Sequence, residues 1–559
     1  MLLPHFDFHP RLLDALKGYD RYRFGQDLSA GMAVGVVALP LAMAFAIASG
    51  AKPETGIFTA IIGGFLISAL GGSRVQIGGP AGAFIVVIYG IIEKYGFANL
   101  LISTIFAGML LFAMGMFRLG TLIRYIPVPI VIGFTNGIAV LIALSQLKEF
   151  FGLDVEKMPG DFFAQITVLA SAAYTVDPTT LIVAILALII MFGWPALIRR
   201  MWARSDFQTL ARLLKPLPAP IVVLALGTLA VSVLDLPIAT IGTRFGGIPQ
   251  SLPSFALPPF NWELVKQLFA PALTIALLGA IESLLCARVA DGLTGDRHDP
   301  NQELMAQGVA NVVTPFFGGL PATGTIARTA TNIRSGATSP IAGIVHACTL
   351  VAIVLVAAPL ATNIPLAALA AILLHVAFNM GEWHEFVRLA KFALSYRILV
   401  IATFLLTVII DLTVAVEVGL VLACVFFIHR ISSLTRIEAL SADALPVALS
   451  PGVSVYSIFG SLFFGAVGKL ECLADSDPAP GKARILKMSQ LINLDSTGLD
   501  ALDTVHRTLQ KQGCQLILCG ANHQPLGLMQ RTGFIDRLGP DNCVANLEHA
   551  IARANALAA

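Results

Sequence analysis

The segment GGLPATGTIARTATN, from Gly318 to Asn332, is the stretch around which the chain is organised. It is rich in glycine and hydroxyl side chains and carries the full positive charge of Arg328. Long apolar runs precede and follow it. A charge placed between such runs is costly at membrane depth, and a substrate or ion pathway is the usual reason for it.

The composition of the whole chain is that of an integral membrane protein. Of its 559 residues 56% are hydrophobic and 13% are charged, and the mean hydropathy is +0.81. The charged share is about half that of a typical soluble domain. The length allows roughly a dozen spans of ~20 residues and one soluble domain. The net charge of +2 gives no reason to expect a nucleic-acid partner, and no removable signal peptide is expected at the N-terminus.

Apolar runs of membrane-spanning length recur along most of the chain. A basic, aromatic lead-in over residues 1–27 precedes the first of them, and we expect it in the cytoplasm. Further spans are predicted at about 28–49, 55–70, 98–117, 127–147, 177–195, 218–234, 265–290, 304–317, 340–359, 365–379, 396–411 and 412–430.

The segment from Gly78 to Phe84 resembles the opening segment in kind. A β-like triplet and a glycine pair lead into Pro80, a residue suited to the first turn of a helix. The apolar stretch that follows, up to Glu93, is too short to cross the membrane unless it begins partway through. This pattern predicts a half-helix.

The pattern of the first half of the chain begins again near residue 262. Pro80 and Ala322 stand roughly 240 residues apart, as do the long spans before them. Two halves of seven crossings each, an odd number, require the second to be inverted relative to the first. We therefore predict an α-helical polytopic membrane protein of 14 spans, with repeat one at about 28–240 and repeat two at about 262–432.

Basic loops set the predicted orientation. Cationic side chains gather between the sixth and seventh spans and again before the thirteenth, which places both loops inside by the positive-inside rule. We therefore expect a multi-pass protein of the cytoplasmic (inner) membrane with both termini in the cytoplasm. The side chains concerned are Arg199, Arg200, Arg204, Arg212, Lys215, Arg388, Lys391 and Arg397.

The last part of the chain has the composition of a soluble domain. After a linker over residues 433–450, strands are predicted at 453–458, 483–488 and 515–519, and helices at 496–512 and 524–531. We expect a small cytoplasmic α/β domain over residues 451–559. Ser496 and Thr497 lie where a loop meets a helix N-terminus, so they are either simple caps or a site of phosphorylation or docking.

The two half-helices predict an anion site. A helix that begins at mid-membrane leaves its first N–H groups unpaired, and these carry about half a positive charge. Two such ends, at about Ala81 and Thr325, face one cavity if the repeats are inverted. Arg328, one turn into the second half-helix, adds a full charge; the alternative is an arginine that locks helices together through a carboxylate. The residues expected to line the site are Phe45, Gly79, Ala81, Phe84, Gly324, Thr325, Ile326, Ala327 and Arg328.

Glu282 is the candidate for proton coupling. It lies in an otherwise uncharged run from Gln267 to Ala287. Burial opposes ionisation of its carboxyl and a nearby Arg328 favours it, so we expect titration near neutral pH. A permanently ionised Glu282–Arg328 ion pair is the alternative.

Other chemistries have no recognisable sequence support. The phosphate-binding pattern GxxxxGK[ST] does not occur, so ATP-driven transport within this chain is not expected. Seven cysteines without regular spacing predict neither disulfides nor a metal site. No nucleophile–base pair is evident, so we expect no cofactor and no enzyme activity.

With these residues in view, the chain resembles the sulfate permease (SulP) family of anion transporters with a C-terminal STAS (sulfate transporter and anti-sigma factor antagonist) domain. The resemblance rests on Leu39–Phe45, Gly79–Ala81, the span of Glu282, the segment 311–332 and the tail. It implies two inverted seven-span repeats, a core domain that moves against a gate domain, and a homodimer.

The resemblance also bears on the substrate. Segments 279–286, 316–319 and 326–328 look most like the bacterial four-carbon dicarboxylate transporters of the family, which implies proton-coupled uptake. Leu41 stands where many sulfate-type members have glutamine. Cys286 stands where sodium-coupled bicarbonate relatives have a hydroxyl residue, and a thiol is a poor ligand for a hard cation.

The sequence thus predicts a secondary active transporter in the lipid bilayer that carries a small anion, foremost succinate or fumarate, together with a proton. A sulfate or bicarbonate transporter is the alternative within the family. From another class, the chain could be a membrane-anchored regulator or sensor whose STAS-like domain binds a cytoplasmic protein partner.

Overall fold

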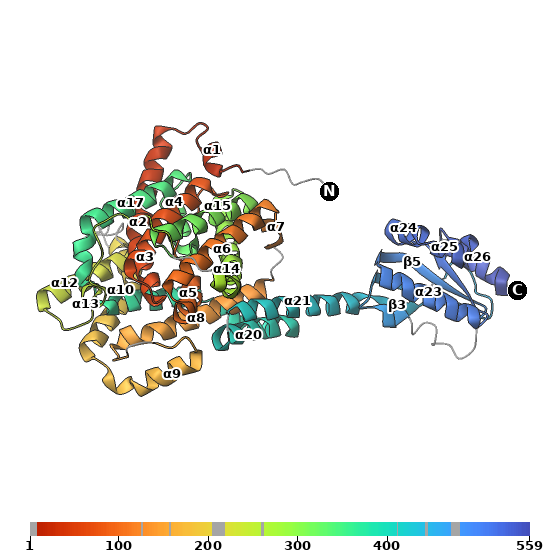
Figure 1. The fold of residues 1–559 in the computed structure, drawn as a ribbon. Coiled ribbons are helices and arrows are strands. Elements are labelled where there is room, and N and C mark those ends of the chain that lie inside the picture. Colours follow the sequence, from red (N-terminus) through yellow and green to blue (C-terminus); the bar gives the residue numbers. More distant parts are fainter. Residues whose placement is uncertain are drawn as a thin grey trace. The chain divides into compact units, whose positions relative to one another are not determined.

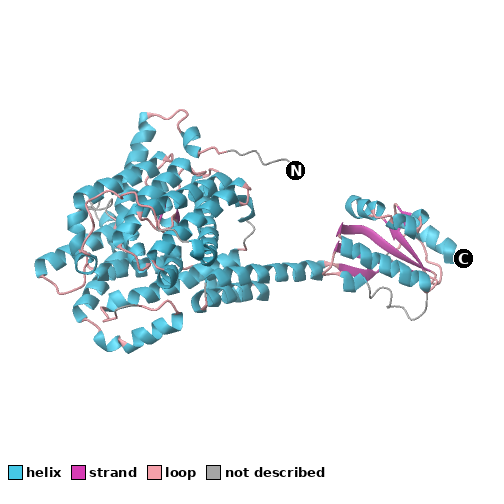
Figure 2. Cartoon of the chain, viewed as in Figure 1, coloured by secondary structure: helices cyan, strands magenta, loops and turns pink. Residues whose placement is uncertain are grey.

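The computed structural model describes residues 8–123, 127–155, 158–203, 218–258, 262–410, 412–441, 445–470 and 481–558. It divides into two compact units, Met1–Leu420 and Val421–Ala559. Figure 1 shows their elements in chain order, and Figure 2 shows that the first unit is mainly helical whereas the second contains a sheet. The predicted loop residues Arg204, Arg212 and Lys215 lie outside the described residues.

Among the described residues, the first half of the helical unit contains nine main elements. A short helix, α1 (Arg11–Ala15), precedes them, and the connecting helices α7 (Gly120–Ile123), α9 (Phe162–Ser171) and α13 (Ile241–Phe245) lie between or after them. The main elements are α2 (Arg21–Ala48), α3 (Pro53–Phe58), α4 (Gly64–Leu70), β1 (Gly78–Gly79), α5 (Ile85–Tyr95), α6 (Phe97–Met116), α8 (Val128–Phe151), α10 (Pro178–Ala203) and α12 (Ala219–Leu234).

The second half repeats this order from residue 262 on. A short helix, α19 (Trp383–Arg388), interrupts it near the end. Its main elements are α14 (Trp262–Thr294), α15 (Pro300–Val313), β2 (Thr323–Gly324), α16 (Ile326–Arg334), α17 (Ile341–Ala357), α18 (Leu366–Met380), α20 (Leu394–Ile409) and α21 (Leu412–Leu434).

Each span predicted from the apolar runs contains a helix in the structure. Eight helices in the described residues are long and apolar enough to cross a membrane, and α9, α12, α17 and α20 are shorter apolar helices. A helical segment satisfies its own backbone hydrogen bonds, which is the requirement for crossing lipid. The number of spans, 14, stays a prediction.

Packing between the helices is reciprocal in the two halves. Helix α17 of the second half packs against α2 and α4 of the first half. Its counterpart in the first half, α6, packs in the same way against α14 and α15 of the second half. Helices α8, α10, α18 and α20 pack against one another as a second group. The reciprocal contacts are those that two structurally equivalent halves produce.

The two halves meet at the short strands β1 and β2. These strands pair antiparallel, with Gly78 opposite Gly324 and Gly79 opposite Thr323. Each strand lies directly before a half-helix, α5 or α16. Antiparallel pairing of equivalent segments is what an inverted repeat requires, and it sets the two half-helix starts beside each other.

Where the structure describes it, the second unit is a five-stranded mixed sheet with helices on both faces. Its strand order is β3 (Arg436–Ala439), β4 (Val453–Leu462), β5 (Ala483–Leu494), β6 (Gln515–Cys519) and β7 (Cys543–Val544). The first pair is antiparallel and the others are parallel. The helices are α23 (Ser496–Lys511), α24 (His523–Arg531), α25 (Phe534–Leu538) and α26 (Leu547–Ala558).

Alternation along β5 divides the core of this unit in two. Leu486 faces a cluster with Leu502 of α23, whereas its neighbour Ile485 faces one with Ile551 of α26. The predicted strands and helices are all present, although β4 and β5 extend beyond the predicted 453–458 and 483–488. Their added length includes shifts in the strand register, which break the alternation that a sequence pattern relies on.

Candidate functional site

The half-helices begin close to the predicted residues. A turn of 3₁₀ helix at Gly82–Phe84 runs into α5, and α16 begins at Ile326 with Thr325 before it as the N-cap. The side chain of Thr325 donates to the carbonyl of Ile77 over 3.0 Å instead of capping α16. The first amides of α16 therefore remain available to a ligand.

Arg328 lies buried between the two half-helices. Its side chain is 1% exposed, and Nη2 is 3.4 Å from the carbonyl oxygen of Pro80. Its Nε and Nη1 have no hydrogen-bond partner among the described residues. The guanidinium also lies so close to Gly79 that a Cβ built there would be 2.3 Å from Nη1. The second half thus supplies a cation at the half-helix start of the first.

Glu282 is on α14, and no described hydrogen bond or ion pair joins it to Arg328. The salt-bridge alternative is therefore absent from the described contacts. Phe84 packs against Gly279, which lies about one turn before Glu282 on α14. A Cβ built on Gly279 would lie 3.4 Å from the ring of Phe84. Phe45 of α2 lies against the start of α5 in the same way, 3.5 Å from a Cβ built on Gly82.

Burial divides the predicted lining into two groups. Ile326 is 42% exposed and Ala327 is also exposed, so the first turn of α16 borders open space. The remaining predicted lining residues are buried: Phe45, Gly79, Ala81, Phe84, Gly324, Thr325 and Arg328.

Several polar side chains around the site were not singled out by the sequence. Thr329, 1% exposed, accepts from the amide of Ile77 over 3.0 Å and from the thiol of Cys286 over 3.2 Å. Asn332 donates to the carbonyl of Val75 over 2.9 Å. The threonines of α16 are visible in the sequence, but the residues that they bond to are too distant in the sequence to be inferred from it.

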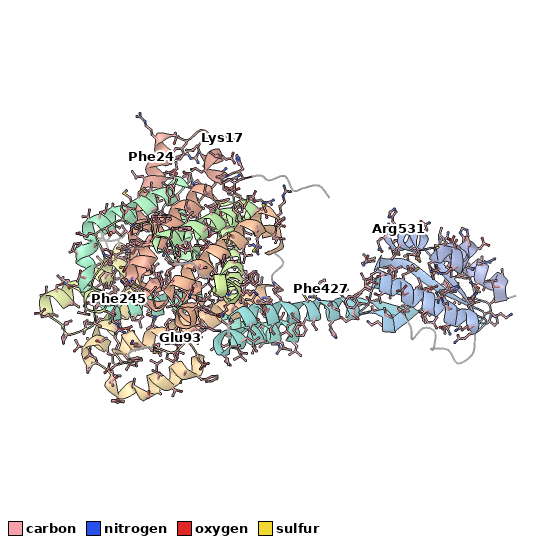
Figure 3. The ribbon with its side chains drawn as sticks, viewed as in Figure 1. Lys17, Phe24, Glu93, Phe245, Phe427 and Arg531 are labelled. Carbon is pink, nitrogen blue, oxygen red and sulfur yellow. The ribbon has the colours of Figure 1, made fainter. Side chains whose placement is uncertain are left out.

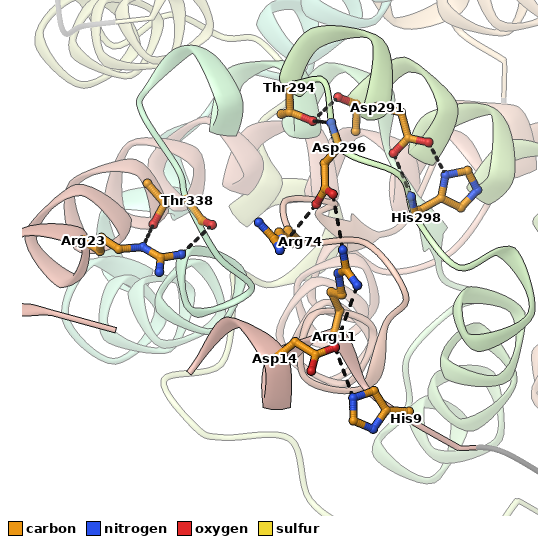
Figure 4. Close-up of polar contacts among 11 residues, drawn as sticks. His9, Arg11, Asp14, Arg23, Arg74, Asp291, Thr294, Asp296, His298 and Thr338 are labelled. Carbon is orange, nitrogen blue, oxygen red and sulfur yellow. Dashed lines mark hydrogen bonds and ion pairs between the residues drawn. The ribbon is translucent and has the colours of Figure 1, made fainter. Parts of the chain in front are cut away.

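Ion pairs hold the segment that leads to the first half-helix. Asp296, after α14, lies 3.3 Å from Nη2 of Arg11 and 3.0 Å from Nε of Arg74 (Figure 4). The Nδ1 of His298, in the same loop, lies 2.7 Å from Asp291 in the last turn of α14. The amide of Arg11 also donates to the carbonyl of Gly71 over 2.9 Å, so the amino-terminal segment contacts both repeats.

Asp14 and Tyr19 in this amino-terminal segment have shifted pKa values. Hydrogen bonds from Lys17 and His9 hold the pKa of Asp14 at about 2. Burial, together with a hydrogen bond to Asp27, raises the pKa of Tyr19 to about 12. Asp14 is thus anionic and Tyr19 neutral throughout the physiological range.

A cavity of about 360 Å³ extends along α5, from Ile85 and Val86 at the start of the helix to Glu93 near its end, and reaches the end of α2. Its lining includes Glu93 of α5 and Phe245 of α13, which Figure 3 labels, and the mostly buried Lys148 of α8. The hydroxyl of Tyr89 donates to the carbonyl of Met158, so α5 is tied to the segment before α9.

In the second unit, Ser496 and Thr497 are exposed at the start of α23. The capping contact there comes from Asp495, whose carboxylate accepts from the amide of Gly498 over 2.7 Å. The two hydroxyls are therefore not the caps of α23, and the reading as a phosphorylation or docking site stays a prediction.

Paired half-helices, a buried cation beside them and an isolated carboxyl define a membrane transporter for anions. Comparison with known proteins agrees with this class. Residues 24–403 match the Sulfate permease family and residues 444–550 match the STAS domain. The chain belongs to the sulfate permease family of anion transporters, and it is not an enzyme.

Relatives in this family carry sulfate and bicarbonate names. The putative sulfate transporter YvdB of Bacillus subtilis (strain 168) is 40% identical, over 95% of this chain and 97% of that protein. The bicarbonate transporter BicA of Picosynechococcus sp. is 27% identical, over 94% of each chain. The dicarboxylate resemblance predicted from sequence finds no support in these names.

Two solved structures show the same fold. The transmembrane domain of a cyanobacterial bicarbonate transporter BicA matches with a TM-score of 0.62 and 31% identity, over 71% of this chain and 98% of that one. The murine anion transporter Slc26a9 in its inward-facing state matches with a TM-score of 0.85 and 18% identity, over 98% and 94%. The second likeness concerns the fold alone.

Proposed function

We propose that this protein moves a small divalent anion together with a proton, by alternating access, across the cytoplasmic membrane. Arg328 carries the proposal: a buried guanidinium with Nε and Nη1 unpartnered in the described residues, beside the starts of both half-helices. A buried charge without a partner is costly, so an anionic ligand is the natural complement. A full charge added to two amide ends suits a dianion better than a monoanion.

Sulfate is the first substrate to test. The relative that is 40% identical is named for sulfate, and the sulfate ion is a compact dianion. The four-carbon dicarboxylates predicted from the sequence are also dianions and remain the second candidate, whereas bicarbonate is the monovalent alternative. All three would contact the same half-helix amides.

Glu282 is the proposed proton carrier. It has no described ion-pair partner and lies on α14 near Phe84, which packs against Gly279 one turn away. Protonation would remove its charge and so change the relative stability of the two orientations of the half-helices. The positively charged loops support an orientation with both termini in the cytoplasm, and the family resemblance supports a homodimer.

Uptake of sulfate, succinate and bicarbonate into proteoliposomes tests the substrate and the role of Arg328 together. Arg328→Ala should raise the KM for a dianion about tenfold, equivalent to roughly 1.4 kcal/mol, and that for bicarbonate less. Arg334→Ala is the matched control, since Arg334 is exposed on the same helix. Equal effects of Arg328→Ala on all three anions, or none, would remove the arginine from the site.

An imposed pH gradient tests the coupling role of Glu282. Glu282→Gln mimics the protonated form, so we expect anion exchange to persist while acid outside no longer drives accumulation. Glu385→Gln serves as the control, because the carboxylate of Glu385 already has an ion-pair partner, the exposed Arg388, over 2.8 Å. Wild-type accumulation by Glu282→Gln would refute the coupling proposal.

A further inference from the structure

Glu303 is a fully buried carboxylate that the transport scheme above does not use. It lies in the first turn of α15 and is 0% exposed. Its Oε2 accepts from the amides of Gly72 and Ser73, over 2.9 and 3.2 Å. Its Oε1 accepts from Gln307 over 3.0 Å and from the hydroxyl of Ser283 over 3.3 Å. Four donors fill the acceptor sites of an ionised carboxylate.

The first pair of contacts fixes the chain segment that leads to the first half-helix. Gly71 and Gly72 allow the close approach, because a Cβ on either would lie 3.0 Å from an atom of Glu303. A Cβ on Gly72 would also lie 2.1 Å from the carbonyl oxygen of Asp299. Residues 74–77 connect this segment to β1, so its position helps to set where the half-helix begins.

The second pair of contacts leads to the other half-helix. Ser283 follows Glu282 on α14, and its hydroxyl also accepts from Nε2 of Gln76 over 2.9 Å. That amide packs against Gly324, where a built Cβ would lie 1.8 Å from Nε2. Gly324 is the last residue of β2, two residues before α16. A chain of contacts thus joins Glu303, Ser283, Gln76 and Gly324.

We infer that Glu303, through Ser283 and Gln76, is a positioning residue for the anion site: it sets the two half-helix starts and the helix of Glu282 relative to one another. This inference rests on the proposed function, because it assigns the network to the anion site described there. Glu303 itself contacts no predicted lining residue in a described hydrogen bond. Its effect on the anion is exerted entirely through the backbone segments that it holds.

Ser283→Ala is the sharpest test, because it removes one hydroxyl and leaves the other contacts of Glu303 in place. We expect the KM for radiolabelled sulfate in proteoliposomes to rise about threefold to tenfold, as for loss of one hydrogen bond, with the maximal rate changed less than about twofold. If the wild type carries succinate or bicarbonate instead, that anion replaces sulfate. Glu303→Gln should raise the KM further, because the NH2 group of the new side chain is a donor and would face the N–H or O–H donors that the carboxylate now accepts from.

A double-mutant cycle separates positioning from general stability. Gln76→Met removes the next contact in the series from Glu303 through Ser283 to Gln76. The double variant Ser283→Ala/Gln76→Met should therefore have the KM of the more impaired single variant. Effects that multiply would contradict the chain. Thr104→Val is the matched control: Thr104 of α6 is equally buried, but its hydroxyl donates to the carbonyl of Leu100 in its own helix. Thr104→Val should leave the KM unchanged.

Arg328→Ala in the same assay distinguishes the two proposals. If Arg328→Ala leaves the KM unchanged, the anion site is misassigned and the proposed function fails. If Arg328→Ala raises the KM while folded Ser283→Ala and Glu303→Gln proteins keep the wild-type value, the positioning role alone is refuted.

Discussion

Gly79 shows how closely the two repeats approach each other at the site. Its backbone has φ of +150°, a region that favours glycine, and a Cβ there would lie 2.3 Å from Nη1 of Arg328. Gly79→Ala therefore has to displace the guanidinium or the strand pairing. We expect it to abolish most anion uptake while the protein still inserts and purifies.

The control for Gly79→Ala is Gly90→Ala on α5, where nothing lies within 4 Å of a built Cβ. It should transport like the wild type, with a slightly raised melting temperature because alanine is the better helix former. Normal uptake by Gly79→Ala would mean that Arg328 is free to move, and would weaken the case for a fixed anion site.

At the residue scale the sequence predicted the charged groups and missed their polar supports. Arg328 and Glu282 were evident because a charge in an apolar run is exceptional. Gln76 and Ser283 could not be recognised in the same way, because each owes its role to the other. The two residues are 207 positions apart in the sequence. A polar side chain in a glycine-rich segment has no periodicity that reveals its partner.

At the element scale, the start of α17 depends on a buried carboxylate in α2. Asp27 is 0% exposed and accepts from the amides of Thr338 and Ser339, over 2.6 and 3.2 Å, and from the hydroxyl of Tyr19 over 2.8 Å. It satisfies backbone donors ahead of α17 from a helix more than 300 residues earlier. This contact joins the first helix of one repeat to an element of the other.

Asp27→Ala should destabilise the purified protein by about 2–4 kcal/mol, since several buried donors lose a charged acceptor at once. The measurement is the detergent-solubilised melting temperature, with Asp20→Ala as the control. Asp20 caps α2 through the exposed amide of Arg23, so its loss should cost only about 1 kcal/mol. Similar shifts for both variants would show that Asp27 does not support α17.

The second span illustrates what an apolar pattern cannot predict. Its position at about 55–70 was predicted correctly as helical, but residues Thr59–Gly63 form a π-helical segment between α3 and α4. There the hydroxyl of Thr59 accepts from the amide of Leu320 over 2.6 Å. One extra residue in a turn leaves hydropathy unchanged, so only the tertiary contact with the opposite repeat reveals the segment.

At the scale of the whole molecule, the proposed anion site and the STAS domain are separate bodies. Every residue of the site belongs to the unit ending at Leu420, whereas the second unit has its own apolar clusters on both faces of its sheet. The boundaries predicted from composition, a transport domain over 28–432 and a STAS-like domain over 451–559, remain proposals. Because each unit has its own core, transport should not require the tail.

A variant that ends at Leu434, the last residue of α21, should therefore take up the anion in proteoliposomes with the wild-type KM. The control is the full-length Thr497→Ala protein, in which an exposed hydroxyl is lost and the sheet is intact. A shortened protein that inserts and binds sulfate but transports none would make the tail part of the transport cycle. If the full-length protein itself moves no anion, the result supports the alternative function of a membrane-anchored sensor. In that case the anion site would serve to detect the anion, and the STAS domain would pass the signal to a protein partner.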